Sequence, residues 1–127
     1  MNIVNALSLS REQIKEIHDI TNLCRKQDGI SLSCPNDGDD FWLLYEGDPE
    51  TSSIRAFFAV FKTDASCWEC YAFTRPDSRG RGYFSALLEA VLTAGQEAGD
   101  PDLCFVTAGM HRRSLNIWKQ SSGMMNI

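Results

Sequence analysis

A short turn rich in glycine and arginine, Arg79-Gly80-Arg81-Gly82, is the part of this chain best suited to chemistry. It lies between a strand-like run that ends at Thr74 and a helix-like run that begins near Tyr83. Gly80 and Gly82 can adopt positive φ and have no Cβ to keep an anion away from the backbone. Main-chain N–H groups, the positive end of the helix dipole and the two arginines converge there. We therefore predict an anion site that suits a phosphate.

The composition favours one folded domain over residues 1–127 and argues against several other classes of protein. Apolar residues make up 43% of the chain and charged residues 23%, which allows a core and argues against disorder. The net charge of −5 does not favour nucleic-acid binding, which needs clustered cations. No apolar run approaches the roughly 20 residues that span a bilayer, and residues 1–10 do not resemble a signal peptide. We therefore expect a cytoplasmic protein with no nucleic-acid or membrane partner.

Five cysteines, Cys24, Cys34, Cys67, Cys70 and Cys104, are expected to be reduced, because an odd number without a signal peptide does not favour a disulfide framework. Cys67 and Cys70 form a C-x-x-C pattern, which is typical of redox or zinc sites. Their surroundings are typical of a strand, in which residues three apart point to opposite faces. No helix starts there to activate a thiolate, and no second C-x-x-C or pair of histidines accompanies them. We therefore expect buried structural thiols and no metal.

Hydrophobic spacing and turn residues predict the elements that would position the glycine turn. Ser10 and Gln13 form a capping box that begins a helix, and Gly29 ends it. The expected strands are 1–7, 41–46, 54–62, 66–74 and 103–107, and the expected later helices are 83–98 and 112–120. Short links make the strands from 41 to 74 an antiparallel meander. The helix between them makes 66–74 and 103–107 parallel neighbours.

With these elements in place, residues 74–88 resemble the core of the GNAT superfamily of acyl-CoA N-acyltransferases. The family signature is Gln or Arg, two residues, Gly, one residue, then Gly or Ala, placed between the fourth strand and the next helix. Arg79 and Gly82 match it, while Phe84 stands at the final small position. The likeness covers the order of elements from about residue 1 to 124 and the motifs from about 69 to 92. It implies an α/β (α+β) fold with a mixed central sheet, in which an antiparallel meander is followed by a parallel splayed strand, flanked by helices.

The resemblance also implies a cofactor site and an activity. In the family, acyl-CoA lies between the splayed fourth and fifth strands, so the main chain of Phe73 and Thr74 would pair with the pantetheine arm. The pyrophosphate would bind the main-chain N–H groups of Arg79, Gly80, Arg81, Gly82, Tyr83, Phe84 and Ser85. The implied reaction is direct attack of a primary amine on acetyl-CoA, the co-substrate, in a ternary complex. A main-chain N–H of the fourth strand would stabilise the oxyanion.

An attacking amine must be neutral, so a general base is useful, and Glu69 is the first candidate. Glu69 is the only carboxylate in the run 66–74, and it alternates onto the same face as Tyr71 and Phe73. Its alternative is a carboxylate on a solvated face of the sheet, and both interpretations stay open. His111 is a second candidate, and its alternative is a surface histidine with no role.

The end of the sequence departs from the family pattern. Residues 115–124 resemble the family's fourth helix, after which members usually continue into two more strands, whereas this sequence ends at Ile127. Many members have a Tyr that protonates the leaving thiolate, and that position is Lys119 here, next to Trp118. We therefore expect the final strands to be absent and the edge of 103–107 to be unpaired. A homodimer or a partner protein would then cover that edge.

Other glycine-loop folds fit less well, and one alternative function stays open. A dinucleotide-binding loop would need a third glycine and an acidic residue at the end of the next strand. A P-loop would need Gly-Lys-Ser or Gly-Lys-Thr, which does not occur. The alternative function is that of a weak or inactive domain that binds CoA or a protein without turnover. No motif identifies the acceptor amine.

Overall fold

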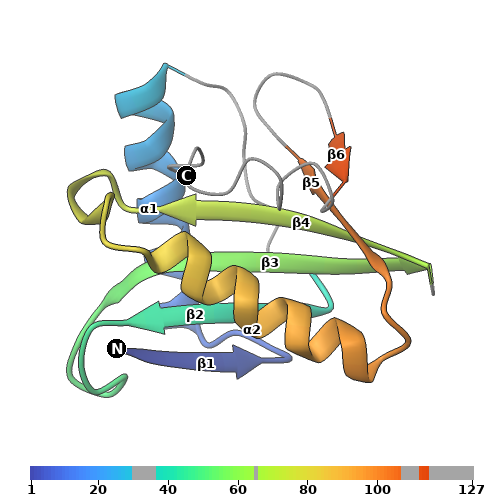
Figure 1. Ribbon diagram of the computed structural model, residues 1–127. Helices are drawn as coiled ribbons and strands as arrows, with labels where there is room; N and C mark the ends of the chain where they lie inside the picture. The colour runs from blue at the N-terminus through green and yellow to red at the C-terminus, as the bar shows by residue number, and fades with distance from the viewer. Residues whose placement is uncertain (30–36, 65, 107–111, 115–127) are drawn as a thin grey trace.

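The computed structural model describes residues 1–29, 37–64, 66–106 and 112–114, which form a mixed sheet with a helix on each face (Figure 1). The strands, in their order across the sheet, are β1 (Asn2–Ala6), β2 (Asp40–Tyr45), β3 (Ile54–Asp64), β4 (Cys67–Thr74), β5 (Asp102–Val106) and β6 (Arg112–Ser114). The helices are α1 (Arg11–Asp28) and α2 (Tyr83–Glu97), with a 3-10 turn, η1 (Pro76–Ser78), between β4 and α2. The predicted α/β (α+β) architecture is confirmed.

The pairing of the strands follows the predicted topology. β1 to β4 form an antiparallel meander, and β5 lies parallel to β4. β3 is the central strand of the meander, and residues 56–60 are all buried. Its nearly continuous apolar sequence is what a strand covered on both faces requires.

Alternation along the strands divides the interior into two apolar layers, one under each helix. On the α2 side, Phe58 of β3 packs against Phe84 and Phe105, with ring centroids 5.3 and 5.6 Å away. Phe84 belongs to the first turn of α2, so this contact anchors the beginning of that helix to the sheet. The bulky residue at the family's small position therefore points into the core.

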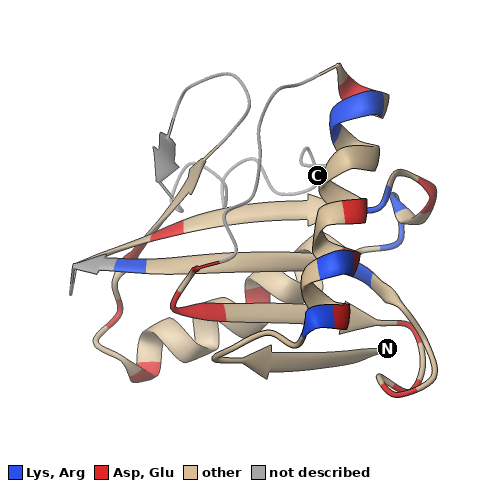
Figure 2. Cartoon of the chain, turned by 180° about the vertical axis from the view of Figure 1, so that it is seen from behind, with Lys and Arg blue, Asp and Glu red and all other residues tan. Residues whose placement is uncertain are grey.

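The other layer lies beneath α1, whose boundaries the sequence predicted. The Ser10 N–H donates to Gln13 Oε1 at 2.8 Å and the Gln13 N–H donates to Ser10 Oγ at 3.2 Å, which completes the capping box. Gly29 ends the helix in the left-handed conformation at φ 65°. Charged side chains lie mainly on α1 and in the loops, while the strands carry few of them (Figure 2). Neither of the helices described is long and apolar enough to cross a membrane.

The segment after β5 corrects the sequence-based expectation. Residues 112–114 form the strand β6 instead of the beginning of a helix, and they pair antiparallel with Cys104–Val106 of β5. The main-chain N–H and C=O groups along the edge of β5 can pair with another strand. For residues 112–114 this pairing outweighs a helical pattern that is weak over three residues. The edge of β5 is therefore covered here, and one strand does follow β5. Residues 115–120 of the expected helix lie outside the described residues, as do His111, Trp118 and Lys119.

The homodimer was expected because the edge of β5 would be unpaired. Since β6 pairs with Cys104–Val106, a partner chain is not needed to cover that part of the edge. Dimerisation itself stays a prediction, and light scattering at high concentration is the measurement that tests it.

Candidate functional site

The glycine turn has the backbone geometry that an anion site needs. Gly80 and Gly82 adopt φ values of 79° and 80°, in the region that only glycine occupies readily. Gly82 is the N-cap of α2, and among the described residues no side chain caps this helix end. The first intrahelical bond runs from the Ala86 N–H to the Gly82 carbonyl at 3.1 Å, so the N–H groups of residues 83–85 precede the helix ladder. These donors lie at the positive end of the helix dipole.

The surface over the two glycines is open. A methyl group built on either Gly80 or Gly82 would meet no atom within 4 Å among the described residues other than its neighbours in the chain. Neither glycine therefore keeps a ligand oxygen from the main chain with a Cβ of its own, as the sequence predicted from the residue type alone.

Arg79 is held by the end of α1. Its Nη1 donates to Asp28 Oδ1 at 2.8 Å and its Nη2 donates to Asp28 Oδ2 at 2.7 Å, a bidentate pair that joins segments 51 residues apart. Nη2 also lies 3.6 Å from the Sγ of Cys24. The hydrogen bond from Arg79 holds the pKa of Asp28 below its ordinary value. The guanidinium therefore fixes the turn to α1, and its charge is compensated within the protein.

Arg81 lies on the other side of the turn, against the end of β2. Its Nη1 donates to Glu46 Oε1 at 2.9 Å, and the Tyr83 hydroxyl donates to the same oxygen at 2.6 Å. The hydrogen bond from Tyr83, followed by the charges of Arg55 and Arg81, lowers the pKa of Glu46. The Arg81 side chain is 55% exposed, against 24% for Arg79, so Arg81 is the more accessible cation.

Sequence reasoning did not single out either of these carboxylates. Asp28 and Glu46 are acidic residues at the ends of a predicted helix and a predicted strand, and nothing in their local sequence points to the turn. Only the folded chain brings them to it.

The β4–β5 ladder ends before β4 does. The paired residues run from Cys67 with Asp102 to Cys70 with Phe105, and β4 continues for four more residues to Thr74. β5 itself ends at Val106, one residue past the last pair, while β4 continues toward the start of α2 (Figure 1). We call this end of the ladder the β4–β5 divergence, because the family resemblance implies that the two parallel strands part there.

Phe73 and Thr74 lie in the part of β4 beyond that ladder. The Phe73 side chain is buried on the α1 side and stacks on Phe57, with ring centroids 5.4 Å apart, so only its main chain could contact a ligand. The Thr74 carbonyl accepts a hydrogen bond from the Cys24 thiol at 3.2 Å. The structure therefore places both predicted residues at the divergence of the two strands.

Glu69 lies one ladder pair before the divergence, opposite Cys104. It is half-buried on the α1 side of β4, on the same face as Tyr71 and Phe73, as strand alternation predicted. The Tyr71 hydroxyl lies 3.5 Å from Glu69 Oε1, at the long limit of a hydrogen bond. About 17 Å of extended chain separates Glu69 from Thr74, which stands at the entrance to the turn.

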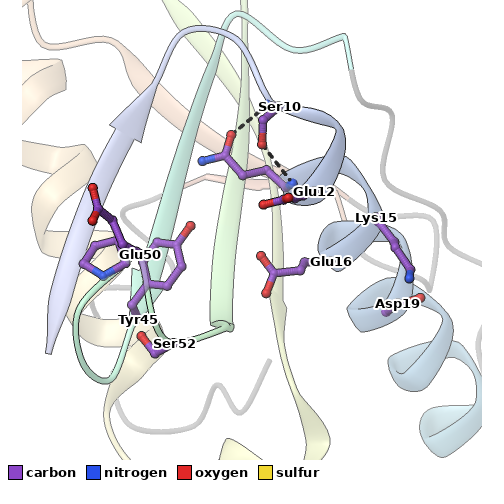
Figure 3. Close-up of a pocket in the computed structure, with 10 residues that line it drawn as sticks. Ser10, Glu12, Lys15, Glu16, Asp19, Tyr45, Glu50 and Ser52 are labelled. Carbon is purple, nitrogen blue, oxygen red and sulfur yellow. Dashed lines mark hydrogen bonds between the residues drawn. The ribbon is translucent and has the colours of Figure 1, made fainter.

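A cavity of about 400 Å³ between the first half of α1 and the β2–β3 turn is a separate feature (Figure 3). Its lining includes four carboxylates and one ammonium group, those of Glu12, Glu16, Asp19, Glu50 and Lys15. This excess of negative charge opposes an anionic ligand. Among the residues that the structure describes, no group of three or more His, Cys, Asp or Glu side chains could hold a metal ion.

The Arg79–Asp28 pair gives a pH-dependent prediction about stability. A carboxyl whose pKa is lowered by folding stabilises the protein above its ordinary pKa of 3.8, and this contribution is lost as the pH falls through the lowered value. We expect Asp28→Asn to reduce the free energy of unfolding by about 1 kcal/mol near neutral pH. The difference from the wild type should shrink below pH 3.8. Thermal unfolding across this range measures it, and Asp19→Asn on the same helix is the control that should change stability less.

Comparisons with known proteins show what this fold resembles. No protein-family model matches the chain, and no curated protein matches it. Solved structures do match: N-acetylglutamate synthase from Neisseria gonorrhoeae, complexed with coenzyme A and N-acetyl-glutamate, has a TM-score of 0.67 at 17% identity. The match covers 97% of this chain and 28% of the synthase.

Two further matches cover more of the other chain. An acetyltransferase from Streptococcus agalactiae has a TM-score of 0.66 at 15% identity, over 95% of this chain and 82% of that one. A GNAT-family acetyltransferase from Staphylococcus aureus has a TM-score of 0.63 at 15% identity, and the match covers 84% of this chain and 74% of that one. This chain therefore has the fold of the GNAT N-acetyltransferases.

Proposed function

We propose that this chain is an N-acyltransferase that moves an acetyl group from acetyl-CoA to a primary amine by direct attack in a ternary complex. The observation that carries the proposal is the succession of two features along the chain, the part of β4 beyond the β4–β5 ladder and then the open glycine turn at the start of α2. The first is suited to an extended ligand arm and the second to its phosphates. Structural neighbours with the same fold include a GNAT-family acetyltransferase and an N-acetylglutamate synthase solved with coenzyme A.

The dimensions of the site favour a long ligand with an anionic end. About 17 Å of strand lies between Glu69 and Thr74. Coenzyme A has an extended pantetheine arm with a diphosphate at one end and the thioester at the other. We propose that the diphosphate binds the N–H groups of residues 79–85 and that the arm follows the main chain of Phe73 and Thr74 toward Glu69.

The chemistry needs a neutral amine and a stabilised oxyanion. Glu69 would accept the proton of the substrate ammonium, and the amine nitrogen would then attack the thioester carbonyl. A main-chain N–H of β4 would donate to the oxyanion, a contribution of about 3 kcal/mol. The C–S bond then breaks, the amide forms, and the CoA thiolate leaves and is protonated. The acceptor is proposed only as a primary amine.

The proposed function includes a cellular location and an oligomeric state. The chain spans about a quarter of the length of the synthase that it matches, so the activity of a whole protein is not carried over from it. We propose an enzyme that acts in the cytoplasm, as a homodimer, on acetyl-CoA and an amine, with no metal in the reaction.

Calorimetric titration with acetyl-CoA, followed by measurement of CoA release with a panel of amines, tests this function. We expect acetyl-CoA to bind and CoA to be released with at least one amine. S-acetylpantetheine, which lacks the diphosphate, should bind about 100-fold more weakly, because several hydrogen bonds to charged oxygens are lost. Binding without release would favour the domain that binds CoA without turnover, and absence of binding would contradict the enzyme and leave a domain that binds a protein.

A further inference from the structure

Two cysteines that the sequence does not connect lie side by side in the sheet. The Sγ atoms of Cys67 on β4 and Cys104 on β5 are 3.0 Å apart, closer than two sulfur atoms in ordinary van der Waals contact. Both side chains are half-buried, on the face of the sheet that also carries Glu69. Cys70, the other cysteine of the C-x-x-C pattern, is not the neighbour of Cys67 in space; that neighbour comes from 37 residues away.

The other described cysteines have different surroundings. Cys70 and Cys24 are fully buried, in the layers under α2 and α1 respectively, and burial raises the pKa of both thiols. Buried thiols with raised pKa values react slowly with oxidants. Cys70 also points to the sheet face opposite Cys67, so these two cannot bond without reversing the alternation of the strand. Cys67 and Cys104 are thus the pair that is both accessible and adjacent.

We propose that Cys67 and Cys104 form an oxidisable dithiol site, at which a peroxide produces a reversible disulfide between β4 and β5. One thiol attacks hydrogen peroxide to give a sulfenic acid and one water. The second sulfur then attacks the sulfenic sulfur, the S–S bond forms and a second water leaves. Two thiols lose two hydrogens and two electrons in total, and the peroxide is reduced to two waters.

The bond would lie within the paired segment of the two strands. Cys67 is in the first pair of the ladder, with Asp102, and Cys104 is in the third, with Glu69, one pair before the ladder ends at Cys70 and Phe105. A disulfide there would join β4 and β5 covalently across their hydrogen-bonded ladder. The inference goes beyond the proposed acyltransferase function and does not depend on it.

Peptide mapping after peroxide treatment tests the proposal on the full chain without any added ligand. Trypsin releases one peptide, 63–79, that contains both Cys67 and Cys70, since Arg75 is followed by proline, and another, 82–112, that contains Cys104. After alkylation of remaining thiols, we expect these two peptides to be joined and to separate on reduction. We expect the free thiols of Cys67 and Cys104 to disappear about tenfold faster than those of Cys24 and Cys70, because the rate of thiol oxidation follows solvent exposure.

Three serine variants identify the sulfur atoms involved. The cross-link should persist in Cys70→Ser and disappear in Cys104→Ser and in Cys67→Ser. A bond between Cys67 and Cys70, a bond from either cysteine to Cys34, or conversion only to sulfinic acid would each overturn the proposal. Because the wild-type chain reports the cross-link by itself, a variant that fails to fold does not remove the test. Failure of acetyl-CoA binding would leave this result unchanged, so the two proposals are tested separately.

Discussion

Replacing Glu69 with glutamine is expected to slow acetyl transfer by about 100-fold to 10,000-fold over about pH 6 to 9. The amide keeps the size of the side chain but cannot accept the proton of an ammonium group. The half-buried position of Glu69, one pair before the β4–β5 divergence, is where a base could reach the attacking amine. Steady-state rates of CoA release measure the effect, and binding of acetyl-CoA by calorimetry should be unchanged.

Two further variants test whether Glu69 acts as a general base or has no role in the reaction. Glu89→Gln removes the same charge from an exposed position on α2 and should leave the rate unchanged. Tyr71→Phe removes the hydroxyl 3.5 Å from Glu69 Oε1 but keeps the carboxylate, so it should slow acetyl transfer much less than Glu69→Gln does. A wild-type rate in Glu69→Gln throughout this pH range would favour the alternative, a carboxylate on a solvated face of the sheet.

Replacing Gly82 with alanine is expected to weaken CoA binding by at least about tenfold, since one lost hydrogen bond to a charged oxygen already has this effect. At φ 80° a Cβ is strained, and relief of that strain would rotate the N–H groups of the first turn of α2. The added methyl also stands on the open surface where the diphosphate would lie. We expect a loss of about 1–2 kcal/mol in stability as well. Calorimetry with CoA and thermal unfolding measure the two effects.

Gly99 offers a matched control for this variant. It follows the end of α2, adopts φ 107°, and a methyl built there would also meet no atom within 4 Å among the described residues other than its neighbours in the chain. Gly99→Ala should therefore lower stability without changing CoA affinity. Equal CoA affinities for the two variants would contradict the assignment of the turn as the anion site.

The two experiments probe different parts of one proposed site. Glu69→Gln is expected to lower the rate of acetyl transfer while CoA binding stays normal, whereas Gly82→Ala is expected to lower the affinity for CoA. The arginines are expected to contribute less than the main chain, since Arg79 and Arg81 are already paired with Asp28 and Glu46. A ligand would have to compete with those carboxylates for the guanidinium groups.

The sequence by itself determined most of the architecture, because the signals are local. The capping box of Ser10 and Gln13, the apolar run of β3 and the glycines before α2 each involve residues a few positions apart. Such neighbours contact each other in any fold that contains the element, so their pattern predicts it. The same locality made the glycine conformations of the turn and the alternation of Glu69 with Tyr71 and Phe73 predictable.

Tertiary structure alone decided which distant groups meet. The pairing of Arg79 with Asp28 spans 51 residues, that of Arg81 with Glu46 spans 35, and that of Cys67 with Cys104 spans 37. The strand at Arg112–Ser114 likewise exists because β5 offers its edge, and the helical pattern of its own residues did not predict it. Contacts of this kind depend on how the sheet and helices pack, and a single sequence carries no short-range record of that packing.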